Sequence, residues 1–180
     1  GYGINGTYSF KTRKFAFFAN AKYGSPYYTG YYGGRFEIRS QANYQITKKS
    51  DLRFIYEKYN FSFFNLFQYN NTNYRNNLTD RYELSYGQSL NQFVNYRTGL
   101  LTKFVSADQL FPTDLDAYFT VLSPGIFGEA YITSNNITFN PRIEIYRSFL
   151  QPINYDQYQF ENGYNSVNVS ANLSRRNIGI

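Results

Sequence analysis

Apolar and polar residues alternate with a period of two along most of this chain. In residues 35–46, for example, Phe36 and Ile38 alternate with Glu37 and Arg39. Successive side chains of a β-strand point to opposite faces of its sheet, so this pattern predicts a strand with one apolar and one polar face. The same alternation recurs in residues 79–90, 137–149 and 166–174, and less regularly in 2–10, 14–23, 52–67, 93–106 and 117–133.

Two of the less regular segments predict local irregularities. In residues 52–67 the alternation changes phase midway, which predicts a β-bulge near Glu57 and Lys58 that places both charges on the polar face. Residues 117–133 predict one long strand with a kink at Pro124 and Gly125, because proline cannot donate to the hydrogen-bond ladder. With these two features the chain carries nine predicted strands.

The connections between the predicted strands alternate strictly between short and long. The short ones are residues 11–14, 48–51, 91–92, 134–136 and 174–177, and the long ones are 24–33, 69–77, 106–116 and 150–163. This alternation predicts an antiparallel up-and-down meander with every short turn at one end and every long loop at the other. Outer-membrane barrels have this asymmetry, with short periplasmic turns and longer extracellular loops.

Strand length distinguishes a membrane barrel from a soluble β-domain of the same alternation. The predicted strands run to about 10–17 residues, whereas strands of globular proteins are most often about 5–6 residues long and a membrane strand needs about 9–11. Phe and Tyr lie near many strand ends, where the aromatic girdles of a membrane barrel are found. The predicted fold is therefore all-β: an antiparallel up-and-down meander that forms a transmembrane β-barrel or a fragment of a larger one.

The strand count favours the fragment. Residues 178–180 read as the opening of a tenth strand, and no separate domain boundary is seen within residues 1–180. Bacterial single-chain barrels have even strand numbers, and an open sheet edge does not occur in lipid. We therefore expect this segment to belong to a larger barrel.

Charged residues recur on the predicted polar faces and form a ladder. Because an Arg on the lipid face costs roughly 2–4 kcal/mol at the bilayer midplane, we expect this ladder to face the lumen. It could set the selectivity of a pore, or its members could pair across neighbouring strands and serve the structure alone. Arg147 is the exception on an apolar face, near a long loop, from which it could snorkel to the interface. The ladder comprises Arg35, Glu37, Arg39, Arg53, Glu57, Arg81, Glu83, Arg97, Glu129, Arg142 and Glu144.

Composition removes several kinds of protein. The 180 residues include no Cys, His, Met or Trp. Catalytic triads, thiol nucleophiles, zinc fingers and haem or iron–sulfur ligation are therefore excluded, and we expect no enzyme activity, no metal and no cofactor. Charged residues make up 17% of the chain, against roughly 25% in ordinary soluble domains.

Aromatic residues cluster in two of the long loops. Rings of this kind could stack on a glycan or a partner protein, because Tyr offers rigid amphipathic contact area. They could equally form the aromatic belt at a membrane interface. The residues are Tyr27, Tyr28, Tyr31, Tyr32, Tyr155, Tyr158 and Phe160.

Basic residues cluster in the short turns and contribute to a net charge of +6. They occur in small groups separated by strands, without the pattern of a nucleic-acid-binding module, so we expect no nucleic-acid partner. Contact with anionic lipid of the outer membrane explains them more simply. The groups are Lys11, Arg13 and Lys14; Lys48 and Lys49; and Arg175 and Arg176.

The Tyr-, Phe- and Asn-rich strands, the Asn-rich loops and the alternating Arg and Glu of the polar faces resemble large outer-membrane β-barrels of the Bacteroidota type. This resemblance is one of composition and pattern over the whole chain, and it assigns no site residue. TonB-dependent transporters and secretion-system barrels are the large members of that group. The resemblance implies a bacterial outer-membrane location and a porin-like channel, or a membrane-embedded component of a transport or secretion assembly with other subunits.

A second hypothesis belongs to another class of protein. A soluble, non-catalytic all-β module could bind a glycan or a protein through its Tyr-rich loops. Dependence on detergent separates the two hypotheses, because only a membrane barrel aggregates without it.

Overall fold

The computed structural model of the chain describes residues 2–24, 35–63, 75–110, 116–134, 137–152 and 161–175. None of them forms a helix long and apolar enough to cross a membrane. They form nine β-strands: β1 (Gly3–Lys11), β2 (Phe15–Gly24), β3 (Arg35–Thr47), β4 (Ser50–Phe63), β5 (Arg75–Ser89), β6 (Val94–Leu110), β7 (Asp116–Ser134), β8 (Ile137–Pro152) and β9 (Glu161–Arg175).

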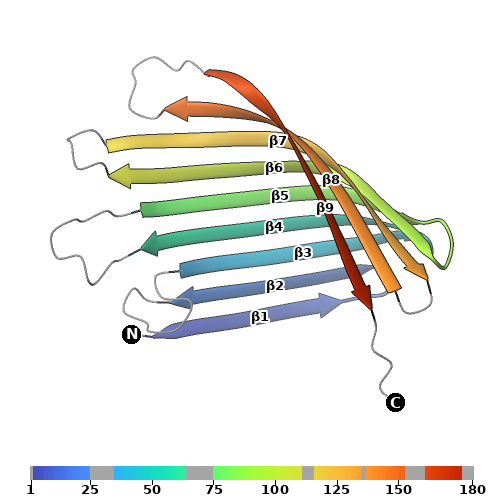
Figure 1. Cartoon of the computed structure of the whole chain (residues 1–180). Helices are drawn as coiled ribbons and strands as arrows, with labels where there is room; N and C mark the ends of the chain where they lie inside the picture. The colour runs from blue at the N-terminus through green and yellow to red at the C-terminus, as the bar shows by residue number, and fades with distance from the viewer. Residues whose placement is uncertain are drawn as a thin grey trace.

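The nine strands make one sheet in the order of the sequence, and every neighbouring pair is antiparallel. The predicted all-β up-and-down meander is therefore confirmed. Strands β1 and β9 are the two edges, and among the described residues they do not pair with each other, so this part of the chain is not a closed barrel. Figure 1 shows the sheet curving strongly, so that β8 and β9 turn across the earlier strands in that view.

The predicted bulge at Glu57 and Lys58 is wrong. Strand β4 pairs without interruption through both residues: Glu57 lies opposite Arg39 and Arg81, and Lys58 lies opposite Asp80. The apparent change of phase arises because Lys58 itself points to the apolar face, where Asp80 compensates its charge. A bulge here would interrupt the hydrogen-bond ladders to both β3 and β5. It is not needed, because Asp80 already compensates the charge of Lys58.

Strand β7 is a single long strand, as predicted, and its pairing with β8 is interrupted at Pro124. Toward β8 the ladder runs from Leu122 to Gly125 without a pair between them, whereas toward β6 it continues through Pro124 opposite Thr102. Proline lacks the N–H that the ladder to β8 would use. The interruption therefore lies where the sequence placed the kink.

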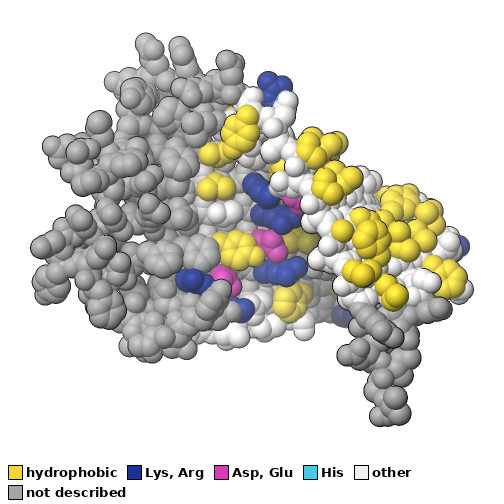
Figure 2. All heavy atoms as spheres, viewed as in Figure 1, with side chains coloured by type: hydrophobic (Ala, Val, Ile, Leu, Met, Phe, Trp, Pro, Cys, Tyr) yellow, Lys and Arg dark blue, Asp and Glu magenta, His cyan; other side chains and the backbone are white. Residues whose placement is uncertain are grey.

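The outward face of the sheet carries continuous rows of apolar side chains. One row crosses six strands, and its members lie directly opposite one another on neighbouring strands with 42% to 62% of their surface exposed. Figure 2 shows hydrophobic side chains over the outward side of the C-terminal strands and charged ones gathered in the hollow of the sheet. The row consists of Phe54, Leu84, Leu100, Ile126, Ile145 and Val167.

On each strand, the residue next to the apolar row points to the concave face, and most of these neighbouring residues are polar or charged. The row beside the apolar one reads Arg53, Ser85, Gly99, Phe127, Glu144 and Asn168. The buried hydrophobic cluster of the described residues is small, with only Leu101, Phe127 and Tyr146, and it lies on this concave face. Soluble domains bury their apolar face and expose their charges, so this sheet is inverted relative to them.

Candidate functional site

Most of the predicted charge ladder converges on the concave face. At its centre the Glu83 carboxylate accepts hydrogen bonds from Arg53 at 2.8 Å, Arg142 at 2.9 Å and Arg81 at 3.2 Å. The Glu129 carboxylate accepts from Arg142 at 2.8 Å and Arg53 at 3.0 Å. We call the connected set the ion-pair network: Arg39, Asp51, Arg53, Glu57, Arg81, Glu83, Arg97, Lys103, Glu129, Arg142 and Glu144.

Several of these contacts join strands that are not neighbours. Arg53 on β4 reaches Glu129 on β7, and Arg142 on β8 reaches Glu83 on β5. On a flat sheet the backbones of strands three apart are about 14 Å from each other, at roughly 4.8 Å per strand. Curvature shortens that distance on the concave side, which is why these side chains meet there.

The two central acids are almost completely buried. Only 2% of the Glu83 side chain and 4% of the Glu129 side chain are exposed. A buried carboxylate needs charged or hydrogen-bonding partners to offset its desolvation, and each of these acids has at least two guanidinium groups. Removal of either acid would take one anionic partner from at least two arginines, although each of these arginines keeps another acid.

Aromatic rings and a cavity complete the site. The guanidinium of Arg142 lies 4.0 Å from the centre of the Phe127 ring, and the Lys103 ammonium lies 4.3 Å from that of Tyr146. Such cation–π contacts hold the long basic side chains in place. A cavity of about 200 Å³ beside the network is lined almost entirely by its charged members, with Tyr131 and Ile55. It offers room for water or small ions on the concave side.

The ladder is not brought together completely, and two network members were missed. Arg35 and Glu37 lie on the same face of β3 as Arg39, closer to its long-loop end. Asp51 binds Arg97 at 2.6 Å, and Lys103 lies 3.7 Å from Glu144. The alternation of side chains along each strand predicts both residues on the polar face, because Asp51 shares a face with Arg53 and Lys103 shares one with Arg97.

A small polar cluster interrupts the outward apolar face. Lys58 lies 3.9 Å from Asp80, and the Tyr56 hydroxyl donates to Asp80 at 2.9 Å. The Tyr56 ring stacks on Tyr82 with 5.0 Å between ring centres. Arg147 also lies on the outward face, as predicted, with its guanidinium 5.5 Å from the Phe149 ring centre. The apolar face therefore carries charge in its long-loop half.

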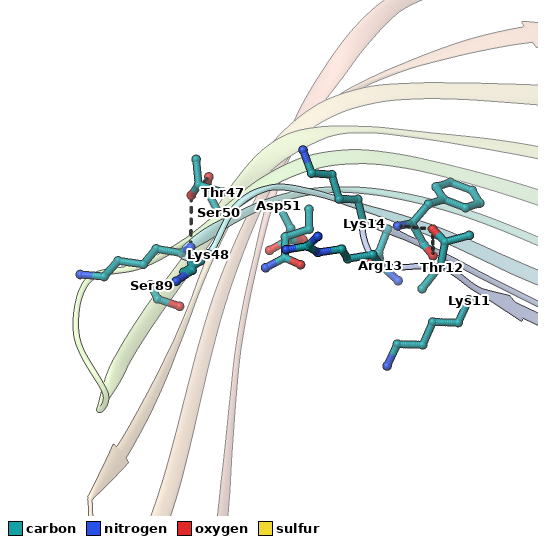
Figure 3. A pocket seen from close by; sticks show the side chains of 14 residues that line it. Lys11, Thr12, Arg13, Lys14, Thr47, Lys48, Ser50, Asp51 and Ser89 are labelled. Atoms are coloured by element: carbon teal, nitrogen blue, oxygen red, sulfur yellow. Dashed lines mark hydrogen bonds between the residues drawn. The ribbon is translucent and has the colours of Figure 1, made fainter.

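A second polar pocket lies at the short-turn end of the sheet, with a volume of about 260 Å³ (Figure 3). Its basic residues come from two short connections. They are Lys11 at the end of β1 with Arg13 and Lys14 of the turn that follows, and Lys48 and Lys49 between β3 and β4. All five are exposed, and none forms an ion pair with another described residue. In Figure 3 Lys11 and Lys14 diverge, and Lys48 extends away from both.

The loop aromatics proposed for glycan or partner contact, Tyr27, Tyr28, Tyr31, Tyr32, Tyr155, Tyr158 and Phe160, lie outside the described residues. Within the described ranges, no group of three or more His, Cys, Asp or Glu side chains could hold a metal ion. Comparison with known proteins finds no matching family model, no matching curated protein and no matching solved structure. The geometry of the sheet is therefore the basis for any functional argument.

Proposed function

We propose that this chain is the wall of a bacterial outer-membrane β-barrel, a membrane-embedded component of a transport or secretion assembly. The observation that carries the proposal is the inversion of the sheet. A row of apolar side chains crosses six strands on the outward face, and the ion-pair network lies one residue away on the concave face. Lipid provides an apolar environment for the outward face, and an aqueous lumen solvates the charged concave face.

The energetic argument against a soluble module is the size of the exposed apolar surface. Fully burying a Leu, Ile, Val or Phe side chain is worth about 1.5–3 kcal/mol relative to leaving it in water. Six such residues stand in the row of Phe54, Leu84, Leu100, Ile126, Ile145 and Val167 alone. A soluble glycan-binding module would turn this face inward, and the described residues provide no second layer that covers it.

The ion-pair network lines the proposed lumen with charged side chains. Its members neutralise one another across strands three apart, so it ties β4 and β5 to β7 and β8 and narrows the space between them. Charged side chains at a constriction decide which ions pass. We therefore assign the network both a structural role and the role of a charged constriction in the transport pathway.

Solubility with and without detergent tests the proposal directly. Protein folded in detergent should insert into phosphatidylcholine vesicles, float with them on a density gradient, and precipitate when detergent is removed in their absence. A circular dichroism spectrum rich in β-sheet establishes that the inserted protein is folded. A folded, monodisperse protein in detergent-free buffer would overturn the membrane proposal in favour of the soluble binding module.

A further inference from the structure

We propose that the polar pocket at the short-turn end is a docking site for an acidic peptide segment of a periplasmic partner protein. Asp or Glu side chains of that segment enter the pocket at the mouth of the proposed lumen. This inference rests on the proposed function for its location, because the loop-length rule of outer-membrane barrels places the short turns in the periplasm. The preference for acidic side chains follows from the pocket itself.

The pocket lies on the concave face of the sheet. Asn43 and Gln45 line it from β3, and Asp51 lines it from β4. Because side chains alternate along a strand, these positions share a face with Arg39 and Arg53 of the ion-pair network. The pocket therefore opens toward the proposed lumen and away from the apolar rows that contact lipid.

Positive charge dominates the lining of this pocket. The one acid among its lining residues is Asp51, whose carboxylate is already engaged by Arg97 at 2.6 Å. All five basic residues of the two short connections are exposed, and none forms an ion pair with another described residue. An anionic group that enters the pocket therefore meets cations whose charge is not yet compensated.

The hydrogen-bonding groups of the pocket favour an acceptor. The Asn43 Oδ1 accepts from the Gln41 amide at 3.2 Å, which leaves the Asn43 NH₂ group to donate to a ligand. Lysine and arginine side chains only donate, and an ionised carboxylate only accepts. Carboxylate side chains therefore match this lining.

Backbone hydrogen bonds anchor both basic connections to the sheet. The Gln45 amide donates to the Lys14 carbonyl at 2.7 Å, and the Ser89 amide donates to the Lys49 carbonyl at 2.8 Å. The backbone of the connections therefore need not be ordered when a ligand binds, which lowers the entropic cost of binding.

The size of the pocket and the spread of its charge favour a peptide over a small molecule. Its volume of about 260 Å³ lies below the roughly 300–1,000 Å³ of pockets for drug-sized ligands, so it suits one or two side chains. Lys11 and Lys14 diverge in Figure 3, and Lys48 extends away from both, so one small anion would not contact all three. An extended segment with several acidic side chains can contact the pocket and the surrounding lysines together.

Fluorescence anisotropy of a labelled peptide tests the docking site. The peptide is a short synthetic chain in which Glu and Ser alternate, with an uncharged dye, and the same peptide with Gln in place of Glu is its control. Both are titrated with the protein folded in an uncharged detergent. We expect saturable binding of the Glu peptide that weakens as ionic strength rises, and no binding of the Gln peptide. Equal binding of the two peptides would overturn the proposal.

Removal of single charges tests the position of the site. Lys14→Gln should weaken binding of the Glu peptide about twofold, and Lys11→Gln/Lys14→Gln or Lys48→Gln/Lys49→Gln about fivefold, from the loss of exposed ion pairs. Lys22→Gln is the matched control, because it removes one charge from the same face at the opposite end of β2, and it should leave binding unchanged. Equal effects of Lys14→Gln and Lys22→Gln would show that the peptide follows overall charge, and the pocket assignment would be wrong.

Blocking the pocket tests the same assignment without removing a basic residue. The chain has no native Cys, so Gln45→Cys can be modified with a bulky uncharged maleimide. Asn5→Cys receives the same reagent as a control, because it lies on the same face about 20 Å from Lys11 along β1. The first modified protein should lose peptide binding and the second should keep it, with circular dichroism showing that both are folded. Binding retained by the modified Gln45→Cys protein would overturn the pocket assignment.

Competition identifies a different ligand, if there is one. Displacement of the peptide by inorganic phosphate, beyond that by chloride at equal ionic strength, would make the pocket a simple anion site. Displacement by phosphatidylglycerol in the micelles, but not by phosphatidylcholine, would make it a headgroup site. Either result would overturn the peptide assignment.

Two outcomes separate this inference from the proposed function. If the protein inserts into vesicles but does not bind the Glu peptide, the docking site is wrong and the membrane proposal stands. If the protein is folded and monodisperse without detergent and still binds the Glu peptide at this pocket, the membrane proposal and the periplasmic location are wrong, and the acidic docking site stands.

Discussion

Glu83 shows how one side chain can hold a curved sheet together. It lies on β5 and accepts from arginines on β4, on β5 itself and on β8. Breaking a buried ion pair by removing one partner leaves an uncompensated charge in a poorly solvated place. The loss therefore exceeds what the pair itself contributes to stability.

Glu83→Gln should lower the free energy of unfolding by about 3–5 kcal/mol, since three guanidinium groups lose their shared anion. Urea unfolding of protein inserted in vesicles, followed by circular dichroism, measures the change. Glu37→Gln is the matched control: it removes the same charge from the same face of the sheet outside the network, and it should cost less than about 1 kcal/mol. Equal effects of the two variants would contradict the central role of Glu83.

Gly99 makes the close approach of β5 and β6 possible on the concave face. A Cβ at this position would meet the Leu84 carbonyl oxygen, and the Ser85 Cα at 2.7 Å. Because the obstacle is backbone, it cannot swing aside, and we expect Gly99→Ala to destabilise the protein by about 1–3 kcal/mol. Gly128→Ala is the control, since a Cβ there meets nothing within 4 Å. Urea midpoints of the two variants decide the comparison.

The strands themselves follow from local sequence, and β4 shows where local reasoning failed. A change of phase in the alternation suggested a bulge, but the ladders on both sides of β4 continue through Glu57 and Lys58. The sequence around β4 contains no sign of Asp80, which lies on the next strand and compensates Lys58 at 3.9 Å. A charge on an apolar face can be interpreted only when its partner on another strand is known.

Cysteine substitution tests the continuous register of β4, and the absence of native Cys makes the experiment clean. Single Cys variants at residues 52–58 are labelled in vesicles with a water-soluble maleimide. Residues 53, 55 and 57 should react from the lumen, and residues 52, 54, 56 and 58 should be shielded by lipid. Labelling of both the residue 57 and the residue 58 variants would contradict the continuous register and support a bulge at this point.

At the scale of the molecule, strand direction constrains how a barrel that contains this sheet closes. Because β1 and β9 are both odd-numbered strands of an antiparallel meander, they run in the same direction. Direct pairing of the two would be parallel. A fully antiparallel barrel around this sheet therefore requires an odd number of additional strands, from the same chain or from a neighbouring one.

Ion selectivity belongs to the same scale, because it depends on the whole lumen. Arg39 and Glu57 lie 3.2 Å apart at the accessible margin of the network. In planar bilayers, Glu57→Gln should shift the reversal potential in a KCl gradient toward anion selectivity, and Arg39→Gln should shift it toward cation selectivity. The opposite signs make each variant the control for the other. If neither variant moves the potential, the ladder does not line a conducting pathway.

The strands, their faces and the meander follow from the amino-acid sequence alone. Alternation with a period of two is a local property: each residue's face follows from its position in its own strand, and connection lengths order the strands. For this reason nine strands, the outward position of Arg147 and the inward position of Arg53 or Glu83 were all within reach of the sequence.

Which charged side chains meet depends on the three-dimensional shape of the sheet. Arg53 joins Glu129 across three strands because the sheet curves, and no local pattern encodes that curvature. The same holds for Asp51 and Lys103, which entered the network through partners on other strands, and for the pairing of Lys58 with Asp80. Contacts between side chains far apart in sequence are set by the shape of the sheet, and that shape is a property of all nine strands together.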